Sequence, residues 1–253
     1  MKDELGSRMK NFYESRSRTY LTRREPVIIR VDGKAFHTFT KGMLKPFDSS
    51  LILTMQLTAR EACKKIQGCK LAYVQSDEIS FLLTDWENLN TEAWFDYDLQ
   101  KLVSISASIA TAEFNKHYEW VNEQALFDSR AFSIPKEEVC NYFIWRQQDA
   151  IRNSIQAIAQ SEFSHKELQG KNTLQMKEML LSKDIDFEKA NIVFQRGSCI
   201  YKSEVYGWKI DNEIPIFTKD RYYIERLVED QPEDNPRFWD FHEPDPASIY
   251  GGE

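Results

Sequence analysis

The chain contains 253 residues, of which 42% are hydrophobic and 13% aromatic, as is typical of a folded globular protein with one large or two small domains. No apolar run approaches the roughly 18 residues that a membrane span needs, so we expect a soluble protein. The formal net charge of -7 does not exclude a nucleic-acid partner, because residues 204–253 hold 5 Lys/Arg and 13 Asp/Glu, whereas residues 1–203 hold 28 and 27.

Hydrophobic periodicity and turn residues divide the chain into helices and strands. In chain order they predict a helix over 5–14, a strand over 27–31, a helix over 49–66 with Asp48 as its N-cap, a β-hairpin over 71–83, a helix over 98–116 and a strand over 131–133. Beyond these they predict a helix over 136–160, shorter helices over 165–182, and a hairpin over 191–202 that turns at Arg196-Gly197. We expect four tryptophans, Trp94, Trp120, Trp145 and Trp208, to lie in the core.

The order strand, helix, hairpin, helix, strand is that of the split βαβ, or ferredoxin-like, arrangement. We therefore expect an α+β protein in which an antiparallel sheet with helices is followed by a C-terminal helical and hairpin extension. The corresponding division places a catalytic core at 1–135, an extension of the same unit at 136–228, and an acidic tail at 229–253. The tail is broken by prolines and has no periodicity, so it wraps the body or stays mobile.

The cysteines Cys63, Cys69, Cys140 and Cys199 are too sparse for a disulfide framework and match no zinc-binding spacing, so we expect reduced thiols. The first eighteen residues contain no apolar stretch of the kind found in secretory signals. We therefore expect a cytoplasmic protein.

Two carboxylates are expected to converge at one end of the sheet. Asp32 follows the first strand and Asp77 lies in the hairpin turn, and these two elements are neighbours in a split βαβ sheet. Paired carboxylates suit Mg²⁺, with phosphate oxygens as further ligands. Gly33 allows a close backbone approach, while Lys34 and His37 can add charge or hydrogen bonds. This set favours two-metal nucleotidyl transfer, although Asp-Gly and Ser-Asp-Glu taken singly are more often ordinary turn residues.

The sequence resembles the histidine-tRNA guanylyltransferase superfamily, whose members add nucleotides to RNA in the 3′-to-5′ direction. The resemblance spans about residues 5 to 210 and rests on five segments in the family's order: RVDGKAFHTFT (30–40), LKPFDSSL (44–51), AYVQSDEISFLL (72–83), FDSRAFSIP (127–135) and YFIWRQQDAIRNSI (142–155). It implies a core like the palm of polymerases.

The resemblance also implies roles for individual residues. Asp32 and Asp77 would hold two Mg²⁺ ions together with the Gly33 carbonyl, and Glu78 would act beside them. The nucleotide would be bound by Gly33, Lys34, Ala35, Phe36, His37 and Ser76, and by Lys45 and Asp48, which match residues of the 5′-activation step. Asp48 is equally well explained as a helix N-cap.

The resemblance implies tRNA, GTP or another NTP, and ATP for 5′ activation as substrates, and a homotetramer as the assembly. Candidate tRNA contacts are Arg130, Arg146, Asn153, Arg196 and Lys202, although each arginine and Lys202 is also explained as an ordinary surface charge or ion-pair member.

One departure from the family concerns the branch. Eukaryotic members carry His-Ile-Asn-Asn-Leu-Tyr-Asn after the Trp-Arg-Gln segment, whereas residues 151–157 here read IRNSIQA and keep only Asn153. This resembles the bacterial and archaeal "like" proteins, which repair 5′-truncated tRNA by template-dependent addition. The alternatives are non-templated addition of G to histidine tRNA, a non-catalytic RNA-binding relative, and a nucleotide cyclase.

Overall fold

The structure is a computed structural model, and it describes residues 3–118, 123–203 and 207–229. Trp120 and nearly all of the predicted acidic tail lie outside these residues. No helix within the described ranges is both long and apolar enough to cross a membrane.

A single antiparallel sheet organises the molecule, with strand order β4-β1-β3-β2-β5-β6. The strands are β1 (Val27–Gly33), β2 (Cys69–Gln75), β3 (Glu78–Leu83), β4 (Phe127–Ser133), β5 (Ser198–Ser203) and β6 (Gly207–Asp211). The first four strands stand in the order 4-1-3-2, with helices after β1 and β3, so the predicted split βαβ core is confirmed. Because β5 pairs with β2, the predicted extension continues the same sheet; the domain division at residue 135 stays a prediction.

Nine α-helices and four short 3-10 helices occur in the described ranges. The α-helices are α1 (Glu4–Phe12), α2 (Phe36–Phe39), α3 (Ser49–Lys65), α4 (Leu99–His117), α5 (Val139–Glu162), α6 (His165–Leu168), α7 (Thr173–Leu181), α8 (Ile192–Arg196) and α9 (Tyr222–Val228). The 3-10 helices are η1 (Glu14–Ser17), η2 (Trp94–Tyr97), η3 (Lys136–Glu138) and η4 (Phe187–Lys189).

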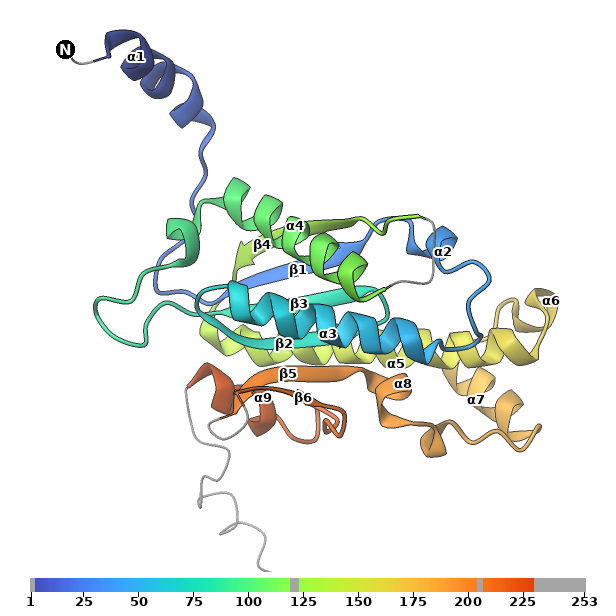
Figure 1. Ribbon diagram of the computed structural model, residues 1–253. Coiled ribbons are helices and arrows are strands. Elements are labelled where there is room, and N and C mark those ends of the chain that lie inside the picture. Colours follow the sequence, from blue (N-terminus) through green and yellow to red (C-terminus); the bar gives the residue numbers. More distant parts are fainter. Residues whose placement is uncertain (1–2, 119–122, 204–206, 230–253) are drawn as a thin grey trace, which may run out of the picture.

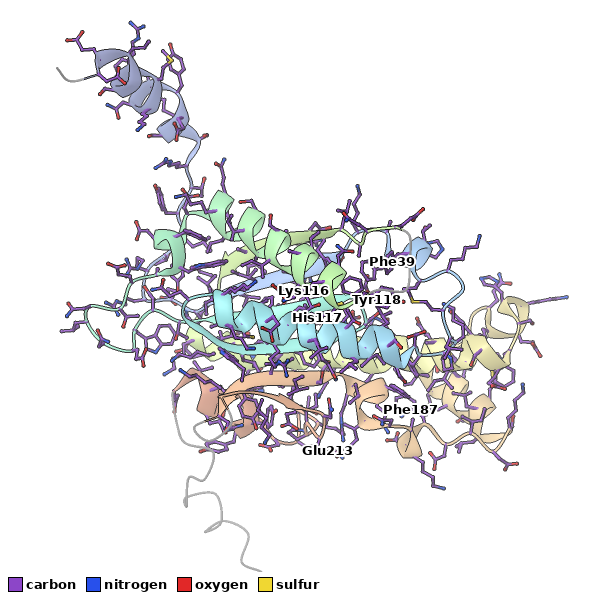
Figure 2. The ribbon with its side chains drawn as sticks, viewed as in Figure 1. Phe39, Lys116, His117, Tyr118, Phe187 and Glu213 are labelled. Atoms are coloured by element: carbon purple, nitrogen blue, oxygen red, sulfur yellow. The ribbon has the colours of Figure 1, made fainter. Side chains whose placement is uncertain are left out.

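Helices cover both faces of the sheet, with α3 and α4 on one side and α5 on the other (Figure 1). Alternation along β1 shows how, because Val27, Ile29 and Val31 pack toward α3 and α4, whereas Ile28 packs toward α5. The central strands β2 and β3 are almost completely buried, as expected for strands covered on both faces. A third apolar cluster joins the second half of α5 to α6 and α7, and it includes the buried Phe187 of η4 (Figure 2).

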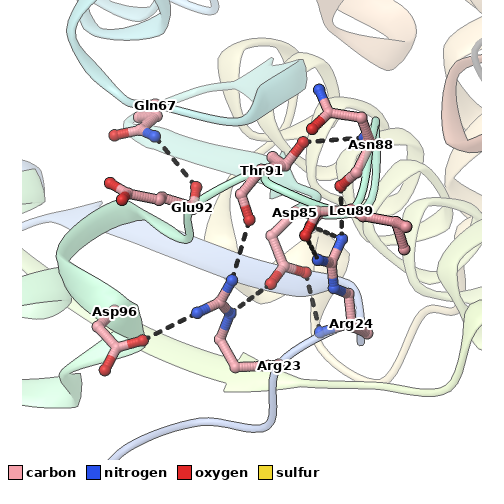
Figure 3. A network of polar contacts seen from close by, with 9 residues as sticks. All are labelled: Arg23, Arg24, Gln67, Asp85, Asn88, Leu89, Thr91, Glu92 and Asp96. Atoms are coloured by element: carbon pink, nitrogen blue, oxygen red, sulfur yellow. Dashed lines mark hydrogen bonds and ion pairs between the residues drawn. The ribbon is translucent and has the colours of Figure 1, made fainter.

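Two consecutive arginines tie the segment before β1 to the loop after β3 (Figure 3). Asp85 is fully buried and accepts hydrogen bonds from Arg23 Nε at 2.6 Å and from the Arg24 amide at 2.9 Å. The Arg24 guanidinium binds the carbonyls of Asp85, Asn88 and Leu89. By contrast, α1 buries no residue and stands away from the sheet (Figure 1).

Two predictions from the sequence are wrong. Residues 191–202 do not form a hairpin: they form the short helix α8, capped by the Asn191 side chain, followed by β5. Trp145 is not in the core, because 48% of it is exposed, whereas Trp94 is buried as expected.

Candidate active site

The candidate site lies where the end of β1 meets the turn between β2 and β3. Asp32 is the Cα partner of Glu78, and the Gly33 amide donates to the Asp77 carbonyl at 3.1 Å. Ser76 and Asp77 form a two-residue turn, in which Ser76 has a positive φ of 50°. The structure therefore brings together the two carboxylates that the sequence predicted would converge.

Both carboxylates are in an environment that favours a cation beside them. Burial, and then the charge of Asp128, raises the pKa of Asp32, while three nearby arginines partly offset the rise. Burial likewise raises the pKa of Asp77, and the charge of Asp32 adds to it. Within the described part of the chain, neither Asp32 nor Asp77 forms an ion pair with a lysine or arginine.

This donor set fits Mg²⁺ only if further oxygens are supplied. Hard oxygen ligands suit this ion, and it commonly takes one or two carboxylates together with substrate phosphates. No group of three or more His, Cys, Asp or Glu side chains in the described residues is arranged to hold a metal by itself. The two carboxylates fit an ion that arrives with phosphate rather than a metal held by protein alone.

The chain turns tightly after the first carboxylate. A Cβ at Gly33 would lie 2.2 Å from the ring of Phe36, so only glycine fits there. The Phe36 side chain belongs to the core, 4% exposed, so any contact it makes with a nucleotide is through its backbone. Its ring lies 4.9 Å from that of Phe39, which in turn contacts Tyr118 at the end of α4 (Figure 2).

Polar groups around this turn face outward. Lys34 and His37 are exposed, and Ala35 adopts the left-handed conformation with φ 54° at the start of α2. The Lys34 amide donates to the Leu126 carbonyl at 2.8 Å and is therefore not free for a phosphate.

Glu78 is engaged in a buried ion pair. Its two oxygens accept from Nε and Nη2 of Arg146, each at 2.8 Å, and Arg146 also binds Asp149 at 3.1 Å. Burial raises the pKa of Glu78, and Arg146 partly opposes this rise. This bidentate geometry supports a positioning role for Glu78, which fixes α5 beside the carboxylates, and it leaves Arg146 only 5% exposed.

A cavity of about 210 Å³ opens beside the hairpin turn. It lies between the loop after α2, the start of α3, the end of β2, α5 and α8, and its lining is mostly apolar. Lys45, Asp48, Ser76 and Asn153 contribute polar groups to it. Asp48 is also the N-cap of α3: its Oδ1 accepts from the Ser50 and Leu51 amides, each at 3.0 Å. The structural explanation of Asp48 is thus confirmed, and a nucleotide role for it stays a prediction.

The predicted tRNA contacts are spread widely over the molecule. Arg130 lies on β4 beside the site, and Asn153 lines the cavity. Arg196 ends α8, and Lys202 lies toward the opposite end of β5. None of these contacts is tested by the geometry, and the buried position of Arg146 favours a structural role for it.

Comparisons with known proteins agree with this geometry. The sequence model of the family described as tRNAHis guanylyltransferase matches residues 6–135. The chain belongs to this family. It is 32% identical to the tRNA(His) guanylyltransferase of Schizosaccharomyces pombe over 186 residues, which are 70% of this chain and 68% of the relative. It is also 30% identical to a "Probable tRNA(His) guanylyltransferase" of Dictyostelium discoideum, over 71% of this chain and 76% of the relative.

Solved structures of the family are similar as well. A bacterial tRNA(His) guanylyltransferase-like protein in complex with ATP superposes with a TM-score of 0.85 and 47% identity, covering 88% of this chain and 99% of that one. A bacterial like protein in complex with GTP gives a TM-score of 0.80 and 43% identity, with 89% and 99% covered. The tRNA(His) guanylyltransferase of Saccharomyces cerevisiae, 22% identical, shares the fold with a TM-score of 0.66. The chain is accordingly a nucleotidyltransferase of the tRNA guanylyltransferase family.

Two residues beside the site, Arg30 and Trp145, were not predicted from the sequence to be functional. Arg30 precedes Asp32 by two positions in β1, so period-two alternation alone places it on the same face. Trp145 gave no such signal, because helical spacing on α5 does not distinguish an exposed tryptophan from a buried one.

Proposed function

We propose that this protein adds nucleotides in the 3′-to-5′ direction to the 5′ end of truncated tRNA, using the opposite strand as template. The observation that carries the proposal is the convergence of Asp32 and Asp77 at the β1 end, beside a cavity of about 210 Å³. A site of this kind brings a metal-bound triphosphate next to a pocket of suitable size for a nucleoside. The complexes of bacterial like proteins with ATP and with GTP support such an occupant.

In the proposed reaction the 3′-OH of an incoming NTP attacks the activated 5′-phosphate of the tRNA. A phosphodiester bond forms, and the bond to pyrophosphate or AMP breaks, according to whether the 5′ end is a triphosphate or is adenylylated with ATP. Asp32, Asp77 and the Gly33 carbonyl would hold Mg²⁺. When bound, Mg²⁺ neutralises phosphate charge and favours loss of the hydroxyl proton.

The chain's own residues orient the reactants. The turn at Ser76 and Asp77 is fixed to β1 by the Gly33 amide, so the two carboxylates keep their relative position. The Glu78–Arg146 pair holds α5 against this turn. Lys45 and Asn153, exposed at the cavity, are placed to contact the nucleotide.

Residues 151–157 favour templated over non-templated addition, because IRNSIQA lacks the leading His of the eukaryotic motif. Non-templated addition of G to histidine tRNA is the second candidate, favoured by the curated names of the relatives. The homotetramer and the cytoplasmic location stay predictions.

The test uses a labelled tRNA that lacks its first nucleotide and carries a 5′-triphosphate, with all four NTPs and Mg²⁺. We expect extension by one nucleotide complementary to position 72, and Asp77→Ala should reduce the rate at least about 100-fold. Asp96→Ala, which removes a carboxylate 71% exposed and outside the site, is the control and should keep the activity.

Changing position 72 separates the two candidate functions. A templated enzyme should change the added nucleotide to follow each substitution. Addition of G opposite every base would support the guanylyltransferase activity instead, and no extension by the wild-type protein would refute both.

A further inference from the structure

At its β1–β4 edge, the sheet face beside α5 is partly exposed to solvent. Along β1, Ile28 is covered by the cluster under α5, and Arg30 and Asp32 follow on the same face. The neighbouring edge strand β4 presents Asp128 and Arg130 on this face, with 56% and 53% of their side chains exposed. A charged, open surface thus begins at Asp32 and runs along β1 and β4.

Two arginines on this surface lie opposite one another, and neither forms an ion pair with the nearby Asp32. Arg30 and Arg130 are direct Cα partners in the β1–β4 pairing, and like charges at such positions repel. Arg130 has one long contact, 3.7 Å, with Asp128. Arg30 forms no ion pair among the described residues, and its Nε is buried without a hydrogen-bond acceptor. A ligand cannot reach this buried Nε, but the terminal nitrogens of Arg30 also have no protein acceptor among the described residues. An anion between these arginines would supply one.

Trp145 supplies an aromatic wall for the same surface. It lies on α5 with 48% of its surface exposed, although large aromatic side chains are usually buried. The guanidinium carbon of Arg30 lies 5.9 Å from the ring centroid and that of Arg146 lies 4.5 Å from it. The ring of Tyr142 contacts it at 5.8 Å. These neighbours hold the indole in place before any ligand arrives.

We infer that Trp145, Arg30 and Arg130 bind the 5′-terminal nucleotide of the RNA substrate, with its base stacked on Trp145 and its phosphate between the arginines. An exposed, fixed aromatic ring beside two arginines, of which Arg30 has no ion-pair partner among the described residues, is the pattern that single nucleotides of RNA occupy. Arg30 is two residues from Asp32, about 7 Å along the strand, so a nucleotide here has its 5′-phosphate within reach of the carboxylates.

This inference rests on the proposed function and adds to the NTP cavity a separate binding surface for the RNA end. The cavity that would take the NTP is lined by Ala150 and Asn153, one to two helical turns further along α5 than Trp145. Arg146 follows Trp145 on α5, before the cavity-lining residues, and it is bound to Glu78 beside the turn. The carboxylates therefore adjoin a cavity for the NTP on one side and an open surface for the RNA end on the other, as transfer between two substrates requires.

The probe is an acceptor-stem RNA hairpin with 2-aminopurine as its 5′-terminal base, prepared with a 5′-monophosphate or a 5′-hydroxyl. Wild-type protein should quench the 2-aminopurine by stacking. Trp145→Leu should abolish the quenching and weaken binding roughly 5- to 100-fold, and Trp145→Phe should recover part of both. Arg30→Gln should remove the preference for the 5′-phosphate.

Arg60→Gln is the matched control. Arg60 carries the same charge and lies on α3, on the other face of the sheet, so its loss changes the net charge equally but not this surface. GTP affinity, measured by calorimetry, should be unchanged in every variant, which shows that each one folds and keeps the carboxylate site.

The outcomes separate this inference from the proposed function. Wild-type protein that binds the hairpin through Trp145 but extends no tRNA would refute the proposed function only. Active protein in which Trp145→Leu leaves RNA affinity and quenching unchanged would overturn the inference. If Trp145→Leu instead lowers the molecular mass by light scattering with RNA binding unchanged, the surface is a contact between copies of the chain, and the inference is again overturned.

Discussion

At the scale of single residues, the contribution of the buried Glu78–Arg146 pair to stability can be measured separately from any contribution to catalysis. Removing one partner of a buried ion pair leaves the other charge uncompensated, so Glu78→Gln should lower the free energy of unfolding by about 3 kcal/mol. The double variant Glu78→Gln/Arg146→Met removes both charges and should recover much of this loss. Urea unfolding measures both effects, and Asp149 keeps Arg152 as its partner in every variant.

The same variants decide how Glu78 acts. If it is a positioning residue, the double variant should regain kcat along with stability, because α5 is again packed against the hairpin turn. A double variant that is stable but at least about 100-fold slower would show that the Glu78–Arg146 pair does more than hold α5 in place, contrary to our expectation.

The sequence predicted that the two carboxylates converge, but it did not predict the arrangement of α5 beside them, and each outcome has a physical reason. Asp32 ends a strand and Asp77 occupies a turn, and strand order in a split βαβ sheet forces these two points together. Arg146 and Glu78 are separated by 68 residues, and nothing local to α5 indicates that the arginine is buried and the preceding tryptophan exposed. A buried arginine and an exposed tryptophan on one helix depend on tertiary partners, and helical periodicity does not predict them.

At the scale of elements, the loop after β3 depends on Asp85. Its carboxylate is fully buried and holds both Arg23 and the Arg24 amide (Figure 3). Asp85→Ala should lower the free energy of unfolding by about 2–3 kcal/mol, because charged hydrogen-bond partners lose a buried acceptor. Limited proteolysis should then cut within residues 86–93 faster than in the wild-type protein.

Asp96 provides the control on the same arginine. It binds Arg23 Nη1 at 3.0 Å, but 71% of its side chain is exposed. Exposed ion pairs contribute about 0–1 kcal/mol, so Asp96→Ala should change neither stability nor cleavage appreciably. Equal effects of the two substitutions would mean that burial of Asp85 is not what fixes the loop.

Elements with long periodic patterns were predicted well, whereas the short apolar run after Asn191 was not. The helices α3, α4 and α5 match the predicted ranges closely because each repeats its apolar face over several turns. The segment Ile192–Arg196 is five residues long, which is too short for periodicity to distinguish helix from strand. The Asn191 cap, whose Oδ1 accepts from the Val193 amide at 2.9 Å, was the available signal.

At the scale of the whole molecule, both faces of the sheet bury cysteines. Cys63 and Cys69 lie in the cluster under α3 and α4, and Cys140 and Cys199 lie in the cluster under α5. All four are free thiols, as the sequence predicted. Burial raises the pKa of Cys140 to about 11, and it also raises the pKa of Cys63 and of Cys199. The folded protein therefore keeps protons that the unfolded chain releases near pH 8.5.

This difference makes stability fall on the alkaline side. Below about pH 8.5 both states hold the Cys140 proton, and above it only the folded state does, so the free energy of unfolding should decrease by at most about 1.4 kcal/mol per pH unit for this thiol. The decrease should continue until about pH 11, the pKa of folded Cys140. The measurement is urea unfolding of wild type and Cys140→Ala, with pH 7.5 to 10.5 as trial conditions. The difference between the two proteins isolates the contribution of Cys140, since every other group titrates alike in both. The variant should gain stability relative to wild type as the pH rises; parallel curves would show that Cys140 ionises as readily in the folded protein as in the unfolded chain.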